Sequence, residues 1–377
     1  MNRPLEGIRI IEIGHMLAGP YCGLLLADLG AEIVKVEPRE GDIARKISPH
    51  QIGAHNAYFA SLNRNKKSVV LDLASEEGRR ALGEIAVNAH ALITNLRPSA
   101  IKKLGLTYDR LKHWNERLVC VALTGFGLEG PYADRPAYDY VVQAMTGIMA
   151  LTGDPEGAPA KAGYSAVDNS AGIMAAVGLL AKIIHGKGGQ VDVAMYDVML
   201  SQLNYLAGAT LNTGERQERL ANSAHPYIVP AQIFPTRDGW LALFITHDKF
   251  WEKFCLEIDR PEWVANPRFS TMAARRLHRN EVVGAIEAVL GTASASEWVD
   301  RLAPLGVVAA EISTLSNALE SALTRHRGLV VDLNSSQSGE PLLAIGSAIK
   351  FSDSQPEYGP PPLLDEHHDD IFPSPQP

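Results

Sequence analysis

The first third of the chain alternates short apolar runs with amphipathic segments, and few folds are compatible with this alternation. Runs typical of buried strands lie at residues 7–14, 31–38, 68–73, 91–96 and 118–124. Helical segments lie between them, including residues 20–30, a helix that follows Ser75, and residues 98–115. Strands that alternate with helices build a mostly parallel sheet with helices on both faces. The sequence therefore predicts an α/β fold with an open, mostly parallel sheet.

The rest of the chain divides into a helical middle, a smaller unit and a return segment. Helical periodicity covers residues 138–151, 168–185 and 196–211, and residues 190–195 are typical of a further strand. Near residue 232 the pattern changes to a β-hairpin around Asp238-Gly239, followed by predicted helices at 249–258, 271–290 and 295–302. Short strands are predicted at 328–333 and 342–344, before a proline-rich tail that we expect to cross back over the first domain.

This pattern predicts two domains. We expect a large Rossmann-like domain made of residues 1–205 and 325–377, in which the second segment completes the first. Residues 206–229 are predicted to be a linker, and residues 230–320 a smaller inserted α+β domain.

Composition excludes several classes of protein. Hydrophobic residues make up 46% of the chain and charged residues 21%, which is typical of a globular protein. The 35 basic and 43 acidic residues give a net charge of −8, which argues against nucleic-acid binding and against a polybasic membrane surface. The longest apolar helical stretch, residues 171–181, falls short of the roughly 20 residues that span a bilayer. No secretory signal pattern precedes the first strand, so we expect a cytoplasmic protein.

Metal and dinucleotide sites are also disfavoured. Cys22, Cys120 and Cys255 lie far apart, and the histidines show no HExxH spacing, so we expect no disulfide framework and no metal. The first strand runs into residues 14–20, GHMLAGP, which lack the GxGxxG fingerprint of dinucleotide sites. By itself, this segment is typical of a tight turn from strand to helix.

Basic and amide side chains follow two of the predicted strands. Arg39 comes after the second strand, Asn95 and Arg97 come after the fourth, and Lys103 lies just beyond. Ligands of open α/β sheets bind at the carboxyl ends of the strands, where these groups could hold phosphates. Any one of them alone is equally compatible with solvated surface charge. Several at one sheet edge favour a phosphate-bearing ligand.

Asp168 opens the apolar helix predicted at 168–185, and two interpretations of it remain open. Aspartate is a preferred helix N-cap, which needs no function. A carboxylate among the N–H groups of a helix start can also act as a nucleophile on a carbonyl, with those donors stabilising the anion that forms.

The chain resembles the family III CoA-transferases, also called the CaiB/BaiF family. The resemblance rests on residues 5–38, LEGIRIIEIGHMLAGPYCGLLLADLGAEIVKVEP; 63–73, NRNKKSVVLDL; 124–149, TGFGLEGPYADRPAYDYVVQAMTGIM; 166–184, AVDNSAGIMAAVGLLAKII; and 189–200, GQVDVAMYDVML. It implies a Rossmann-like large domain built from both ends of the chain, with a small domain inserted between them. It also implies an interlocked homodimer.

The resemblance further implies an activity and a site. The enzyme would move CoA from an acyl-CoA donor to a small carboxylic acid, through an aspartyl mixed anhydride and an aspartyl-CoA thioester. The catalytic aspartate of the family falls on Asp168. The positions that would contact coenzyme A, which is present only as the acyl-CoA substrate, are His15, Met16, Ala18, Arg39, Leu71, Asn95, Arg97, Lys103 and Tyr138.

Departures from the family pattern narrow the substrate. Leu17 stands where formyl-CoA transferases have glutamine, and residues 212–232 lack their glycine-rich loop, so formate and oxalate are not expected. An α-methylacyl-CoA racemase of the same fold is one alternative, but it needs a second acid/base group. The histidine of the racemase motif is replaced here by Tyr138. A non-catalytic acyl-CoA-binding protein is another alternative, against which Asp168 argues.

Overall fold

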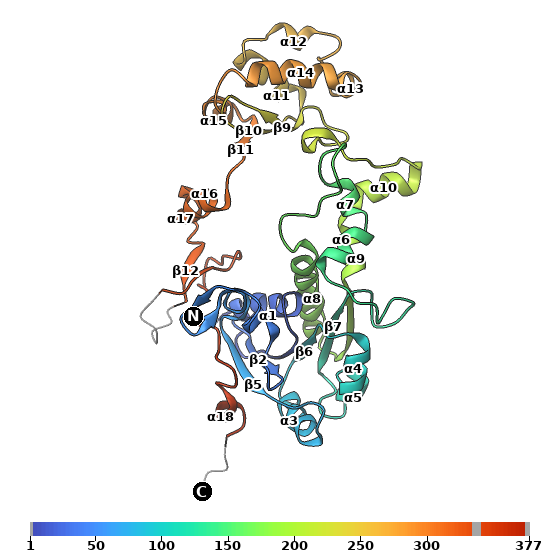
Figure 1. Cartoon of the computed structure of the whole chain (residues 1–377), viewed down its shortest axis with the longest axis vertical. Coiled ribbons are helices and arrows are strands. Elements are labelled where there is room, and N and C mark those ends of the chain that lie inside the picture. Colours follow the sequence, from blue (N-terminus) through green and yellow to red (C-terminus); the bar gives the residue numbers. More distant parts are fainter. Residues whose placement is uncertain (1–2, 334–340, 374–377) are drawn as a thin grey trace. The chain divides into compact units, whose positions relative to one another are not determined.

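The computed structural model describes residues 3–333 and 341–373, which fold into two compact units (Figure 1). The first unit comprises residues 1–146, 162–213 and 322–377, and the second comprises residues 147–161 and 214–321. Every candidate site residue proposed from the sequence lies in the first unit. The fold of that unit therefore positions the site.

The first unit is built on a six-stranded sheet in which every neighbouring pair of strands is parallel. Its order is β5-β2-β1-β6-β7-β8. The strands are β1 (Arg9–Ile13), β2 (Glu32–Glu37), β5 (Lys66–Val70), β6 (Ala91–Thr94), β7 (Val119–Thr124) and β8 (Gly189–Ala194). The predicted α/β class and mostly parallel sheet are confirmed.

Helices join these strands and cover both faces of the sheet (Figure 1). Those between the strands are α1 (Ala18–Asp28), α2 (Ala57–Asn63), α3 (Glu76–Val87), α4 (Pro98–Leu104), α5 (Tyr108–Leu111), α6 (Asp139–Met145) and α8 (Ala166–His185). Helices α9 (Met195–Gln202) and α10 (Asn204–Thr213) follow β8, the last strand of this sheet. On one face, Leu82 of α3 and Ile101 of α4 pack in one core with Ile11 and Val34. Helices α1 and α8 pack against each other on the opposite face. The apolar strand runs are thus buried from both sides.

The order of the strands creates a switch point at the carboxyl edge of the sheet. From β1 the chain proceeds to β2 and β5 on one side, and it then crosses to β6 on the other side of β1. The loops after β1 and β6 therefore leave the sheet in opposite directions. In open α/β folds, a ligand crevice forms at such a point.

Several predicted helices are shorter in the structure than the sequence pattern suggests. The helix expected over 98–115 ends at Gly105, which adopts a left-handed φ of 72°, and a second helix starts at Tyr108. The helix expected over 138–151 is broken at Gly147, with φ 84°, into α6 and α7 (Ile148–Leu151). A glycine in this conformation ends a helix at little steric cost. The helix expected over 196–211 is likewise divided into α9 and α10.

The second unit contains the predicted hairpin and a third strand that was not predicted. Its strands β9 (Ala231–Pro235), β10 (Trp240–Phe244) and β11 (Val308–Glu311) form an antiparallel sheet in the order β11-β10-β9. Its helices are α7, η2 (Ala221–Ser223), α11 (Asp248–Glu257), α12 (Glu262–Ala265), α13 (Met272–Leu277), α14 (Arg279–Leu290), α15 (Ala295–Leu302), η3 (Ala303–Leu305) and α16 (Leu315–Glu320). Trp251, Phe254 and Trp298 lie in its core. The helix expected over 271–290 is interrupted at His278.

The remaining short elements belong to the first unit. They are η1 (Ile43–Arg45), β3 (Gln51–Ile52), β4 (His55–Asn56), α17 (Ala322–His326), β12 (Val330–Asp332), β13 (Leu343–Ile345) and α18 (His368–Ile371). The C-terminal segment binds back onto the start of the chain. The backbone N–H of Val70 donates to Asp365, and that of Gly359 donates to Asn65.

Helix α8 corrects one expectation from the sequence. It has 20 residues and, by length and composition alone, is long and apolar enough to cross a membrane. The apolar stretch expected from the sequence, residues 171–181, was too short to do so. The core helix of a soluble protein passes the same test. Here Ala171, Ala175 and Leu179 are fully buried, and the helix packs on α1, β7 and β8.

Candidate active site

Two neighbouring cavities lie at the carboxyl edge of the sheet in the first unit. The larger has a volume of about 620 Å³ and extends along the ends of β1 and β2. The smaller, of about 90 Å³, contains Asp168. His15 and Leu96 line both cavities, so the two meet at the loops that follow β1 and β6.

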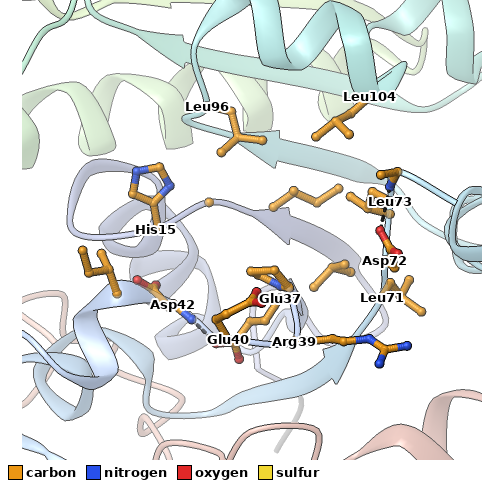
Figure 2. A pocket seen from close by; sticks show the side chains of 17 residues that line it. His15, Glu37, Arg39, Glu40, Asp42, Leu71, Asp72, Leu73, Leu96 and Leu104 are labelled. Carbon is orange, nitrogen blue, oxygen red and sulfur yellow. Dashed lines mark hydrogen bonds between the residues drawn. The ribbon is translucent and has the colours of Figure 1, made fainter.

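The larger cavity combines apolar walls with charged side chains of both signs. Figure 2 shows Leu96 and Leu104 on one side of it, with Arg39 and Leu71 on the other. Three of the predicted contact residues, His15, Arg39 and Leu71, line this cavity, as do four acidic residues, Glu37, Glu40, Asp42 and Asp72. The apolar walls fit an apolar portion of a ligand, and Arg39 is the arginine that can meet an anionic group there.

The smaller cavity gathers most of the other predicted residues around Asp168. It is lined by His15, Met16, Leu17, Tyr58, Asn95, Leu96, Arg97, Pro98, Leu123, Thr124, Gly125, Ala133, Arg135, Ala137, Tyr138, Asp168 and Met195. Two predicted contacts line neither cavity: Ala18, which is buried at the start of α1, and Lys103, which is exposed on α4.

The sequence left open whether Asp168 is the N-cap of its helix, and in the structure it is not. Helix α8 begins two residues earlier, at Ala166, and Ser165 is its N-cap. Asp168 therefore lies in the first helical turn, where the exposed N–H groups favour a negative charge. Among the residues that the structure describes, no hydrogen bond or ion pair holds the Asp168 carboxylate, which leaves its oxygens available to a ligand.

The surroundings of Asp168 disfavour its ionised form. Burial raises the pKa of the Asp168 carboxyl to about 7, and the nearby Asp139 carboxylate contributes in the same direction. Its carboxylate is therefore poorly solvated, unlike that of a surface aspartate. A poorly solvated carboxylate is a stronger base than a hydrated one, which favours a nucleophile or a proton carrier.

Asp139 and Gln143 of α6 fix the segment that leads to Asp168. Asp139 Oδ1 accepts the backbone N–H of Val167 at 2.8 Å, and its Oδ2 accepts from Gln143 Nε2 at 2.7 Å. Gln143 Oε1 accepts the backbone N–H of Ala162 at 2.9 Å. Asp139 thus does not cap its own helix, and its side chain binds the first turn of α8. Both ends of residues 162–167 are thereby held.

The loop after β1 is tied to the loop after β6 by Asn95. Its Oδ1 accepts the backbone N–H of His15 at 3.0 Å, and its Nδ2 donates to the His15 carbonyl at 2.9 Å. A side chain at Gly14 would collide with this amide. Asn95 is therefore occupied by protein backbone, and its role here is to join the two loops at the switch point. Burial lowers the pKa of the adjacent His15 imidazole.

Two ionisable residues of the smaller cavity, Tyr58 and Arg135, were not predicted from the sequence. Tyr58 comes from α2, a helix that the pattern did not reveal. Burial raises the pKa of the Tyr58 phenol, and the negative charges of Asp168 and Asp42 add to the effect. Arg135 lies in the irregular segment before Tyr138. Its position inside the resembling segment 124–149 was the one available signal.

This arrangement suits attack by a carboxylate on an activated carbonyl. Asp168 supplies an unpaired, poorly solvated carboxylate. Arg97 and Arg135 supply positive charge in the same cavity. The adjoining larger cavity can receive the rest of an extended ligand. Among residues 3–333 and 341–373, no group of three His, Cys, Asp or Glu side chains is placed to bind a metal ion.

Comparison with known proteins agrees with this chemistry. The family model described as CoA-transferase family III matches residues 5–368. A succinate–glutarate CoA-transferase of Agrobacterium fabrum is 34% identical over 98% of this chain and 95% of its own. An acetyl-CoA:oxalate CoA-transferase of Acetobacter aceti is 33% identical over 96% of this chain and 93% of its own.

Solved structures agree as well. The crystal structure of a CAIB/BAIF family protein from Brucella suis superposes with a TM-score of 0.86, at 32% identity, over 99% of both chains. The residues that carry the resemblance, the parallel sheet and these comparisons lead to one assignment. The chain belongs to CoA-transferase family III and is an enzyme of that class.

Proposed function

We propose that this enzyme moves CoA from an acyl-CoA donor to a small carboxylic acid, with Asp168 as the nucleophile. The observation that carries the proposal is the state of the Asp168 carboxylate. It is half-buried, it has no hydrogen-bond partner among the described residues, and burial raises its pKa to about 7. A surface helix cap has none of these properties.

The reaction proceeds in four balanced steps. The Asp168 carboxylate attacks the thioester carbonyl, which forms a mixed anhydride and releases CoA thiolate. The thiolate attacks the aspartyl carbonyl, which forms an aspartyl-CoA thioester and releases the donor acid. The acceptor carboxylate then attacks that thioester, which forms a second anhydride and frees the thiolate again. The thiolate finally attacks the acceptor carbonyl, which yields the new acyl-CoA and regenerates Asp168. Covalent catalysis thus divides one difficult exchange into easier steps.

The CoA moiety is proposed to occupy the larger cavity, with its thiol end directed to Asp168 past His15. Arg39 lies in that cavity, and Arg97 lies in the smaller one beside it. Together with Lys103 on α4, these side chains would meet the phosphates. Arginine is well suited to phosphate because its guanidinium donates two parallel hydrogen bonds.

A homodimer is part of the proposal. Helix α8 exposes 46% of Ile173 and 55% of Val177, although Ala171 and Ala175 on its other side are fully buried. Leu315 of α16 and Leu323 of α17 are also more than two-thirds exposed. A second copy of the chain that covers these apolar side chains accounts for their exposure. Sedimentation that finds only a folded monomer at micromolar concentration would contradict the dimer.

A panel of acyl-CoA donors and carboxylic acids tests the reaction. Mass spectrometry of the CoA products should show a new acyl-CoA whose acyl group comes from the added acid. Free CoA and hydrolysed donor alone would mean that the protein is a thioesterase. Loss of the configuration at the α-carbon of the acyl group, with no exchange of acyl groups, would mean that it is a racemase.

A further inference from the structure

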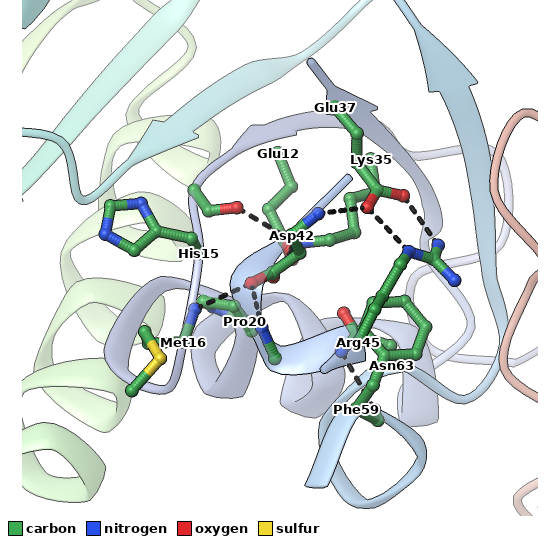
Figure 3. A network of polar contacts seen from close by, with 12 residues as sticks. Glu12, His15, Met16, Pro20, Lys35, Glu37, Asp42, Arg45, Phe59 and Asn63 are labelled. Carbon is green, nitrogen blue, oxygen red and sulfur yellow. Dashed lines mark hydrogen bonds and ion pairs between the residues drawn. The ribbon is translucent and has the colours of Figure 1, made fainter. Parts of the chain in front are cut away.

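The loop between β1 and α1 contacts a cluster of charged side chains that, apart from Arg45, are almost completely buried. This buried charge cluster, most of which is drawn in Figure 3, consists of Glu12, Lys35, Glu37, Asp42, Arg45 and Lys66. It contains three acidic and three basic groups, so its formal charges balance. None of these residues attacks or protonates a substrate in the mechanism above.

The central contacts of the cluster are short and desolvated. Lys35 Nζ lies 2.9 Å from Glu12 Oε1 and 2.9 Å from Asp42 Oδ2, and all three side chains are fully buried. Lys66 Nζ lies 2.7 Å from the other Glu12 oxygen. Removing such charges from water costs more than most ion pairs return, so a cluster of this kind is weak evidence for a role in stability. Such a cluster can instead fix the geometry of the loop that it contacts.

Three members of the cluster bind backbone atoms of the loop above it. Lys35 Nζ donates to the carbonyl of Gly14 at 3.0 Å. Asp42 Oδ1 accepts the backbone N–H of Met16 at 3.1 Å, and Lys66 Nζ donates to the carbonyl of Pro20 at 2.8 Å. Residues 14–20 are therefore held from below, while Asn95 holds His15 from the side.

The Asp42 contact coincides with an unusual backbone conformation. Met16 has a φ of 65°, in the left-handed region that residues with a Cβ rarely adopt. In this conformation the Met16 N–H points to Asp42, as Figure 3 shows. His15, Met16 and Leu17 then all line the cavity that contains Asp168. A relaxed Met16 would move this wall of the cavity.

We propose that Asp42 is a positioning residue for acyl transfer, which acts by holding Met16 in its left-handed conformation and so keeps the 15–17 wall in place opposite Asp168. The proposal rests on the proposed function, in which Asp168 is the nucleophile. The competing explanations are that Asp42 only balances the charge of Lys35, or only caps the short helix η1, whose Ala44 N–H its Oδ1 also accepts at 2.9 Å.

Two conservative substitutions separate geometry from charge. Asp42→Asn, made together with Lys35→Met so that its –NH2 group does not face the Lys35 ammonium, keeps an oxygen where Met16 needs an acceptor but loses the charge. Asp42→Glu keeps the charge but moves the carboxylate by one methylene. A positioning role predicts that Asp42→Asn retains kcat within about fivefold, and that Asp42→Glu lowers kcat about 100-fold, the scale of a 1 Å misplacement in an active site. Because Asp42 also lines the cavity proposed for CoA, KM for the acyl-CoA is measured in both, and a positioning role predicts a larger change in kcat than in KM.

A rescue experiment tests the route through Met16. Glycine adopts a φ of 65° without steric cost. Asp42→Glu should therefore lower kcat much less in a Met16→Gly background than in the wild-type background. If circular dichroism shows that Asp42→Glu does not fold, Asp42→Ala takes its place in the same cycle. Asp28→Asn, which disrupts the buried Asp28–Arg64 pair at the other end of α1, is the control for lost stability.

The outcomes are distinct. Loss of kcat in Asp42→Glu, retention in Asp42→Asn and rescue by Met16→Gly support the proposal. Four results would overturn it. They are an equal loss of kcat in both Asp42 variants, an equal loss of kcat in Asp28→Asn, the same effect of Asp42→Glu on kcat in the wild-type and Met16→Gly backgrounds, and a change confined to KM. Failure of the proposed function would be seen separately, because wild-type enzyme would then form no covalent adduct at Asp168.

Discussion

The Asp139 carboxylate accepts the backbone N–H of Val167, whose neighbour in the chain is the proposed nucleophile Asp168. One residue thus holds the first turn of α8 and places a negative charge beside the carboxylate that it positions. The same contact explains why Ser165 makes no side-chain cap. The backbone N–H of Val167, one of the donors that a capping side chain would bind, is bound instead by Asp139, 28 positions earlier in the chain.

The Asp139 charge should be visible in the pH dependence of catalysis. Asp168 must be ionised to attack, so kcat should rise with pH through the region around 7. Asp139→Asn removes the repulsion and should move this rise to lower pH, although burial remains the larger cause. Gln143→Met disrupts the same hydrogen-bonded segment without changing a charge, and its profile should keep the wild-type midpoint. Identical midpoints in all three proteins would contradict the role of Asp139.

Asp168 should lower the stability of the folded enzyme at high pH. Its pKa is about 7 in the folded state against 3.8 as the usual value, so folding favours the protonated carboxyl. That favourable contribution is complete below pH 4 and is lost as pH rises through about 7. Asp168→Asn cannot ionise. At pH 8 its free energy of unfolding, measured by urea denaturation, should therefore exceed that of wild type by about 1–2 kcal/mol after allowance for partial exposure.

The comparison of these two proteins at pH 4 is the control. The difference in their free energies of unfolding should be much smaller there, because the folded Asp168 is neutral and the unfolded Asp168, with a usual pKa of 3.8, is only partly ionised. A difference that does not change between pH 4 and pH 8 would show that the pKa of Asp168 is not raised.

Arg39, Arg97 and Lys103 should contribute to CoA affinity in a graded way. Each is exposed, and exposed ion pairs are individually worth about 0–1 kcal/mol. Each single alanine substitution should therefore weaken CoA binding by about fivefold or less, and the triple substitution by considerably more. Isothermal titration with CoA at two salt concentrations measures this. Lys112→Ala, which removes an exposed lysine paired with Asp109 on α5, is a matched control. An unchanged affinity in the triple variant would refute the phosphate assignment.

The sequence predicted the sheet well because its strands are buried on both faces and are therefore continuous apolar runs. The strand β11 was missed because it has only four residues, VAAE, two of which are alanines with low strand propensity, and it pairs with β10 from an earlier part of the chain. Lys35 and Lys66 are charged residues within strands β2 and β5. Nothing local reveals that both meet Glu12, because the contacts form between strands only once the sheet is assembled.

The site was predicted unevenly for the same reason. Asp168 and Arg39 follow recognisable elements, and both lie in cavities at the sheet edge. Asn95 was expected to meet the ligand, whereas its amide joins two loops of the protein. Tyr58 belongs to a seven-residue helix with no clear periodicity. Contacts between distant segments decided these cases.

Asp168→Asn is the variant that separates a nucleophile from a structural carboxylate. The amide nearly keeps the shape of the side chain, so folding and CoA binding should persist. It cannot form the anhydride, and kcat should fall by about 10³-fold or more. The Asp197→Asn change at the start of α9 alters a first-turn aspartate outside both cavities and serves as the control.

Covalent trapping tests the central claim most directly. Wild-type enzyme is mixed with acyl-CoA, treated with hydroxylamine or borohydride, digested and analysed by mass spectrometry. We predict one modified peptide, with the modification on Asp168, and no modification in Asp168→Asn. A modification at another residue, or full transferase activity in Asp168→Asn, would contradict the account.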